Sequence, residues 1–184
     1  MPRKRLPIGI QTFREIREGG YYYVDKTGFA LRLIEEGKYY FLSRPRRFGK
    51  SLFLDTLAEL FSANQILFAG LAAEDRWRWD WGRRYPVIRL SFADGVLQSR
   101  TELDGKIAEL LSDNEARLGV RSTHRSVSGR FHGLISAAAA HYGERAVVLV
   151  DEYDKPILDN LAQPDRAREM RDGLRNLYSV IKGA

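Results

Sequence analysis

The sequence contains no cysteine, only three histidines and no long hydrophobic run. The absence of cysteine excludes disulfide bonds and thiolate metal sites. His124, His132 and His141 do not have the spacing of a metal site. No apolar run approaches the roughly 20 residues that a membrane helix needs, and residues 1–5 lead into no hydrophobic signal segment. We therefore expect no contact with a membrane and a location in the cytoplasm.

The composition is that of a folded globular protein. The 184 residues are enough for one α/β domain with a sizeable core, and 44% of them are hydrophobic and 29% charged. We find no internal repeat, low-complexity tract or interdomain linker. The sequence therefore predicts a single domain over residues 1–184.

The positive charge is concentrated near the N-terminus. The net charge is +6, and residues 1–50 carry 12 Lys and Arg against 5 Asp and Glu, whereas the remainder carries 18 against 19. A nucleic-acid-binding protein more often spreads its basic residues over a whole face, whereas a triphosphate site needs them beside one loop. Residues 1–5 are either an arm that contacts nucleic acid or a disordered terminus.

The most informative stretch is residues 39–54. An apolar run at 39–42 predicts a strand, a basic turn follows, and Gly49-Lys50-Ser51 opens an amphipathic helix over residues 51–61. This order is typical of a phosphate-binding loop, in which N–H groups at a helix N-terminus surround an anion. Lys50 would reach the β- and γ-phosphates, and the Ser51 hydroxyl would bind Mg²⁺. The full set of nucleotide-binding residues in this interpretation is Arg46, Arg47, Phe48, Gly49, Lys50, Ser51 and Leu52.

The loop departs from the usual pattern at its first glycine position, which is occupied by Arg44. Pro45 restricts Arg44 to extended conformations and fixes its own φ, so stiffness is expected to replace glycine here. The alternative is a basic surface turn followed by a helix that happens to begin with Gly-Lys-Ser.

A second motif lies about a hundred residues further on. Residues 146–150 form an apolar run that predicts a buried strand, and Asp151 and Glu152 follow directly. In a Walker B motif, Asp151 would hold Mg²⁺ through water, and Glu152 would orient and deprotonate the attacking water. The alternative is a core strand that ends in a solvated acidic turn. The two motifs in this order favour the nucleotide site.

Further elements frame these motifs. Residues 87–92 predict another core strand, and helices are expected at 28–36, 101–118, 130–142 and from Pro164 onwards. Trp77, Trp79 and Trp81 alternate with arginines, which either stack on bases or anchor a long connection to the core. Residues 23–27 either frame an adenine or pack as an N-terminal segment.

Several of these strings together resemble one known family. They are Tyr-Val-Asp-Lys-Thr at 23–27, Phe-Leu-Ser-Arg-Pro-Arg-Arg-Phe-Gly-Lys-Ser at 41–51, Tyr-Pro-Val-Ile at 85–88 and Val-Asp-Glu-Tyr-Asp-Lys-Pro-Ile at 150–157. The sequence is similar to the AAA-ATPase-like family of bacterial and archaeal proteins, within the additional-strand P-loop NTPases. The resemblance implies ATP as the nucleotide and makes Arg44 part of the family's normal loop.

The resemblance also implies a three-layer α/β P-loop fold, with a parallel sheet flanked by helices. We expect a lead-in over residues 1–37 and a P-loop core over 38–184. In this class the strand after the Walker B motif lies between the Walker A and Walker B strands, and we find no such strand after Glu152. The core is therefore expected to be incomplete at its C-terminus, and longer relatives commonly continue into a domain similar to PD-(D/E)xK nucleases.

The function expected from these residues is ATP·Mg²⁺ binding with weak or absent hydrolysis. Lys50 and Glu152 are the expected catalytic residues, and Ser51 and Asp151 the expected metal ligands. Hydrolysis in this class usually needs a sensor residue on the next strand and an arginine finger. The expected partners are ATP and a second copy or a C-terminal continuation that completes the sheet. The alternative is a nucleotide-indifferent interaction module, or one that contacts nucleic acid through residues 3–5 and the Trp/Arg stretch.

Overall fold

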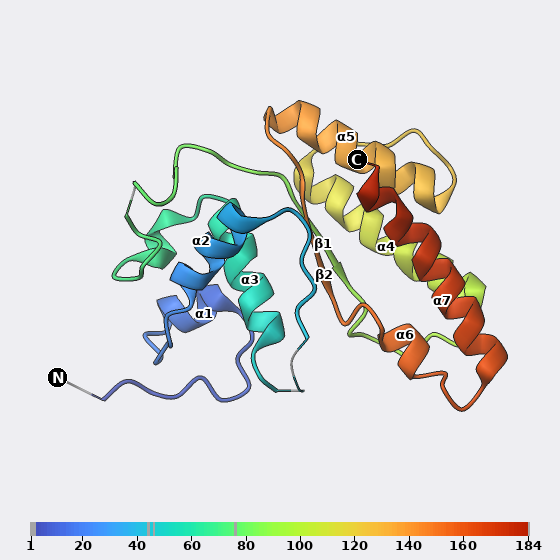
Figure 1. The fold of residues 1–184 in the computed structure, drawn as a ribbon, viewed down its shortest axis with the longest axis horizontal. Helices are drawn as coiled ribbons and strands as arrows, with labels where there is room; N and C mark the ends of the chain where they lie inside the picture. Colours follow the sequence, from blue (N-terminus) through green and yellow to red (C-terminus); the bar gives the residue numbers. More distant parts are fainter. Residues whose placement is uncertain (1–2, 44, 46, 76, 184) are drawn as a thin grey trace. The chain divides into compact units, whose positions relative to one another are not determined.

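The computed structural model describes residues 3–43, 45, 47–75 and 77–183. They form two compact units, Met1–Arg84 and Tyr85–Ala184, and each unit is described by itself (Figure 1). The sequence predicted a boundary between residues 37 and 38, which differs from the boundary between these two units. That division into a lead-in and a P-loop core stays a prediction. Arg44 and Arg46, two residues of the predicted loop, lie outside the described residues.

The first unit is helical. It contains α1 (Phe13–Glu18), α2 (Thr27–Glu36), α3 (Lys50–Phe61) and the short 3₁₀ helix η1 (Gln65–Phe68). Its core is apolar and aromatic, with the Phe13 ring 4.9 Å from the Phe68 ring and 5.1 Å from the Tyr23 ring. The predicted helices at 28–36 and 51–61 are confirmed as α2 and α3, each with one additional residue at its start.

Polar contacts fix the segment that leads into α2. The Asp25 carboxylate accepts hydrogen bonds from the N–H groups of Thr27 and Ala72, each at 2.8 Å, and the Thr27 hydroxyl accepts the Ala73 N–H at 3.0 Å. Partial burial raises the pKa of Asp25, but the backbone hydrogen bonds outweigh it and hold that pKa below its usual value. These contacts fix Asp25 and Thr27 in the first unit, and Lys26 between them is exposed.

The second unit combines a small parallel sheet with helices. The strands β1 (Val87–Ser91) and β2 (Val147–Asp151) pair in register from Val87 opposite Val147 to Ser91 opposite Asp151. The long helices α4 (Arg100–Leu118), α5 (Val127–Tyr142) and α7 (Pro164–Ser179) lie on one face of this sheet (Figure 1). The short helices are α6 (Lys155–Leu158) and η2 (Val180–Lys182).

One apolar core joins the sheet to these helices. Ile88, Leu90 and Phe92 alternate along the chain and are buried against α4, α5 and α7, because side chains two residues apart share a face of a strand. Serine caps determine where two helices begin: Ser99 accepts the Glu102 N–H and Ser126 accepts the Gly129 N–H. The predicted helices at 101–118 and 130–142 are thus confirmed as α4 and α5, with their starts moved to these caps.

The two edges of the sheet differ. On the outer edge of β1, Asn114 of α4 accepts the Arg89 N–H and donates to the Arg89 carbonyl, both at 2.8 Å, and Arg117 donates to the Val87 carbonyl. On the other edge, β2 pairs with no strand other than β1 within the described part of the chain. Side chains of α4 therefore hydrogen-bond to the outer edge of β1, whereas the outer edge of β2 has no paired strand among the described residues.

The predicted strand at residues 39–42 is not formed. The described residues around it are irregular, and the sheet contains only β1 and β2. An apolar run becomes a strand only when a neighbouring strand takes its N–H and C=O groups, and none is present among the described residues. The chain is therefore a mixed α/β protein with a two-stranded parallel sheet. Among the described residues, no helix has the length and apolar character needed to span a membrane.

Candidate functional site

The loop before α3 has an alternating backbone. Arg47 has φ 66° and Gly49 has φ 75° with ψ 28°, both left-handed, whereas Phe48 between them is not left-handed and Lys50 is helical. Such alternation turns successive N–H groups toward one side and forms a concavity that can receive an anion. The loop at residues 47–50 thus has two left-handed positions of the kind that occur in anion-binding nests.

Arg47 is the unexpected member of this loop. A side chain other than glycine in the left-handed region costs about 1–2 kcal/mol, and such strain gathers at functional sites. The sequence led us to expect stiffness from Pro45 in place of glycine. The structure instead places the unusual conformation at Arg47, where the residue type gives no sign of it.

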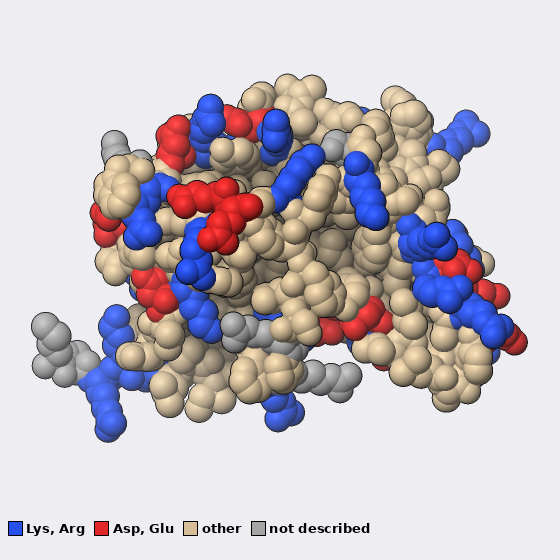
Figure 2. All heavy atoms as spheres, viewed as in Figure 1, with Lys and Arg blue, Asp and Glu red and all other residues tan. Residues whose placement is uncertain are grey.

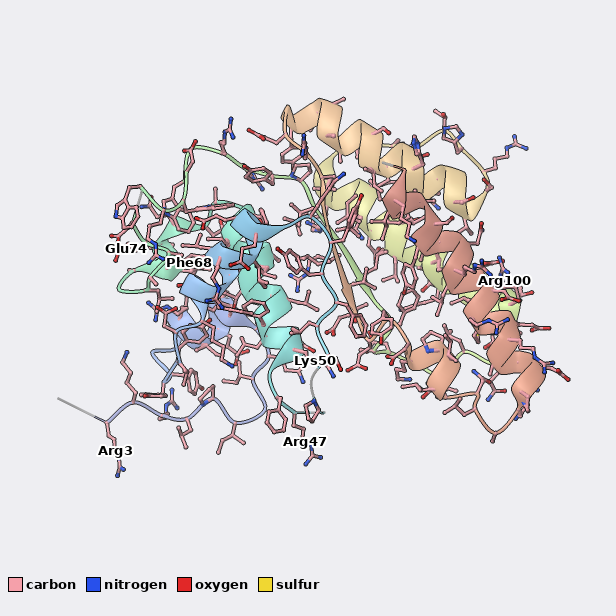
Figure 3. The ribbon with its side chains drawn as sticks, viewed as in Figure 1. Arg3, Arg47, Lys50, Phe68, Glu74 and Arg100 are labelled. Carbon is pink, nitrogen blue, oxygen red and sulfur yellow. The ribbon has the colours of Figure 1, made fainter. Side chains whose placement is uncertain are left out.

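The N-terminus of α3 has no side-chain cap among the described residues. Gly49 is its N-cap and offers no side chain, in contrast to Ser99 and Ser126 at the starts of α4 and α5. The first N–H groups of a helix lack partners within the helix, and the helix dipole favours an anion there. Lys50 occupies this first turn and Arg47 lies on the loop just before it (Figure 3). Lys50, Ser51 and Leu52 are all partly buried, whereas Arg47 and Phe48 are exposed.

The two predicted acidic residues lie at the end of β2. Asp151 is the last residue of the strand, and Glu152 follows with φ 49° in the left-handed region. The Glu152 N–H donates to the Asp151 carboxylate at 3.0 Å, and both side chains are partly buried. The strand end therefore redirects the chain at Glu152 through a strained residue.

Three side chains hold the turn that follows. Lys155 donates to the Gly95 carbonyl at 2.6 Å, Asn160 donates to the Leu97 carbonyl at 2.7 Å, and the Tyr178 hydroxyl donates to the Tyr153 carbonyl at 3.3 Å. Burial, followed by the nearby Asp154 charge, raises the pKa of Tyr178, so its hydroxyl stays protonated as a donor. Sequence reasoning missed these roles. Lys155 lies within the string at residues 150–157 on which the family resemblance depends. No sequence pattern marks Asn160 or Tyr178 as a hydrogen-bond donor to a distant carbonyl.

The predicted site residues form two groups in the structure. Arg47 to Leu52 come together in the first unit, and Asp151 and Glu152 come together in the second. No cluster of three or more His, Asp or Glu side chains that could hold a metal occurs among the residues described. The Ser51 hydroxyl in the first unit and the Asp151 carboxylate in the second are each oxygen ligands of a type that Mg²⁺ takes.

The Trp/Arg stretch mainly anchors a connection. Trp79 is 8% exposed and packs edge-on against Phe61, and the Trp81 indole N–H donates to the Glu74 carbonyl at 3.2 Å. Trp77 is 82% exposed, with the Arg78 guanidinium over its ring. On α7, ion pairs join Arg168 to Asp165 and Arg171 to Asp172. Figure 2 shows basic and acidic side chains interspersed over this part of the second unit. The alternative module that contacts nucleic acid gains no support from these surfaces.

The chain is thus a mixed α/β protein with left-handed loop residues before a helix and a strand that ends in two adjacent acids. The chain belongs to the AAA-ATPase-like family, because the family model described as "Predicted AAA-ATPase" matches residues 7–184. This membership supports nucleotide binding.

A curated relative shows how the chain compares with a longer protein. It is named "Uncharacterized protein in vnfD 5'region", comes from Azotobacter chroococcum mcd 1, and is 68% identical over 183 residues. The match covers 99% of this chain and 35% of the relative, so the chain spans about a third of that protein's length. No solved structure matches the chain.

Proposed function

We propose that the chain is an ATP·Mg²⁺-binding module of the P-loop type. The observation that carries the proposal is the pair of left-handed residues, Arg47 and Gly49, directly before the N-terminus of α3, which has no side-chain cap among the described residues. Membership of a family of predicted ATPases supports the same conclusion. The three-layer P-loop fold is part of this proposal, with β1 and β2 as two strands of a larger parallel sheet.

Each residue of the loop has a role in this proposal. The N–H groups of residues 46–52 bind the phosphates, and Lys50 and the guanidinium groups of Arg46 and Arg47 balance their negative charge. Ser51 and Asp151 would be ligands of Mg²⁺, which would neutralise charge on the phosphates. Phe48 and Gly49 contribute backbone, with Gly49 taking the left-handed conformation at low cost.

Hydrolysis by this chain is proposed to be weak or absent. Glu152 orients and deprotonates a water molecule, and the contacts of Lys155, Asn160 and Tyr178 keep the adjoining turn in place. The sensor residue and the arginine finger that the class usually needs are not identified in this chain. Binding, and not turnover, is therefore the property to measure first.

The decisive experiment compares ATP affinity in wild type and Lys50→Ala, with and without Mg²⁺. Loss of a charge-assisted contact in a partly desolvated loop should weaken binding at least about tenfold, or about 1.4 kcal/mol. Lys106→Ala, which removes a lysine of α4, is the matched control and should bind like wild type. Equal affinity of wild type and Lys50→Ala, with the fold intact by circular dichroism, would remove the nucleotide site.

A second pair of variants distinguishes the role of Asp151 from that of Glu152. Asp151→Asn should reduce the Mg²⁺ dependence of ATP binding, whereas Glu152→Gln should leave binding intact and abolish any turnover. Loss of binding in Glu152→Gln alone would show that the roles are reversed. Single-stranded DNA, titrated over a salt series beside ATP, tests the alternative function directly.

A further inference from the structure

A shallow notch lies beside the loop within the first unit. It is lined by Lys26 and Phe29 at the start of α2, Leu42 and Phe48 before α3, and Lys50 and Phe53 in the first turn of α3. Its volume is about 30 Å³, room for a water molecule or two. A larger group would therefore lie across the mouth of the notch.

The lining is aromatic and unusually exposed. Phe48 is 59% exposed and Phe29 is 38% exposed, whereas Phe53 is buried beneath them. The rings of Phe29 and Phe53 lie 5.8 Å apart at an angle of 41°, and the Arg32 guanidinium lies 5.3 Å from the Phe29 ring. Exposed rings beside cationic groups suit a ligand that has both a flat apolar ring and negative charge.

The notch continues directly from the proposed phosphate site. Lys50 lines it and is also the first residue of α3, and Phe53 lies one helical turn further along on the same side. A ligand whose phosphates occupy the loop would thus place its remaining part within reach of these rings.

Lys26 gives the notch a second cation. Its neighbours Asp25 and Thr27 are engaged in the hydrogen bonds that fix the chain to Ala72 and Ala73, and Lys26 is exposed between them. Its position on the notch is therefore set by contacts on both sides. A lysine ammonium donates to ring nitrogen and carbonyl acceptors, which an aromatic base carries.

We propose that this notch is the seat of the base of the bound nucleotide, with Phe48 and Phe29 in contact with the ring and Lys26 donating to its edge. The inference rests on the proposed function and adds to it the residues that distinguish a nucleotide from plain inorganic polyphosphate. It assigns a ligand contact to Lys26 and Phe29, which lie outside the phosphate loop.

The test compares two probes, ATP and inorganic tripolyphosphate, by calorimetry in the presence of Mg²⁺. Wild type should bind ATP at least about fivefold more tightly than tripolyphosphate, because contact of a base with an aromatic ring contributes on that scale. Phe48→Ala should reduce this advantage, because it weakens ATP binding more than tripolyphosphate binding. Phe29→Leu, which keeps an apolar side chain of similar size against Phe53, should act in the same direction.

A variant at Trp77 is the control for the base seat. Trp77→Ala removes an exposed ring of the same unit outside the notch and should leave both affinities unchanged. Equal wild-type affinity for ATP and tripolyphosphate, or equal weakening of both probes in the variants, overturns the base seat while the phosphate site stands. If wild type binds neither probe, the proposed function itself is wrong and the base seat is wrong with it.

Discussion

Single residues determine the backbone conformation of the loop before α3. The free-energy cost of the left-handed conformation can be measured at Arg47. Its φ of 66° is a conformation that glycine adopts readily and other residues do not. Arg47→Gly should therefore be more stable than Arg47→Ala by about 1 kcal/mol in urea unfolding. This order is the reverse of the order expected in a helix.

A matched pair of variants at Arg175 provides the control. Arg175 is exposed within α7, where glycine should be less stable than alanine by about 1 kcal/mol. If glycine is the less stable variant at both positions, Arg47 is not left-handed in solution, and the anion-binding geometry of the loop is wrong.

At the same scale, Glu115 gives a prediction about pH. Arg130 donates to its two carboxylate oxygens at 3.0 and 2.6 Å, and these hydrogen bonds outweigh burial and hold the pKa of Glu115 below its usual value. A carboxylate whose pKa is lower in the folded state stabilises the protein above the unfolded-state pKa, near pH 4.3. That contribution is lost as the pH falls through the folded-state pKa.

Glu115→Gln should accordingly lower the free energy of unfolding at pH 7 by about 1.5–3 kcal/mol, the range for hydrogen bonds to charged groups. The difference from wild type should shrink as the pH falls below about 4. Glu109→Gln is the control, because Glu109 is an exposed residue of the same helix and should change stability little. A deficit that is constant from pH 7 to pH 3 would contradict the role given to the charge.

At the scale of elements, the edge of β1 depends on a side chain that replaces a strand. Asn114 takes both backbone groups of Arg89, so Asn114→Ala leaves an N–H and a carbonyl without their partners. We expect a loss of about 1–3 kcal/mol in urea unfolding. Asp113→Ala, an exposed neighbour in α4, should change stability by less than about 0.5 kcal/mol. Equal effects of the two substitutions would show that Asn114 does not close the edge.

The sequence predicted most elements because their signals are local. Apolar periodicity and caps lie within each segment, so α2, α3, α4, α5 and both strands were found to within a few residues. The predicted strand at residues 39–42 was wrong because a strand requires a neighbouring strand, and the periodicity of a segment does not show whether one is present. The left-handed Arg47 and the contacts of Asn160 and Tyr178 were also out of reach, because they depend on backbone geometry and on residues distant in the sequence.

At the scale of the whole molecule, the feature with the widest consequence is the edge of β2 that pairs with no strand among the residues the structure describes. The Val147 N–H donates to Pro86 and the Asp151 carbonyl accepts from Phe92, so Val147, Leu149 and Asp151 face β1. Because alternate residues of a strand face opposite edges, Val148 and Val150 direct their N–H and C=O groups to the open edge. An edge without a paired strand is a template for another strand.

We therefore predict that the isolated 184-residue chain associates through the β2 edge, and that Val148→Pro reduces this association. Proline removes the N–H directed to the open edge and leaves the bonds to β1 in place. Leu149→Pro is the contrasting variant, because it removes a bond to β1 and should destabilise the second unit. Light scattering over a protein concentration series, with circular dichroism to check folding, measures both effects. A wild-type chain that stays monomeric and unfolds in one cooperative step would show that β2 needs no further strand, and that the larger parallel sheet proposed for this chain is wrong.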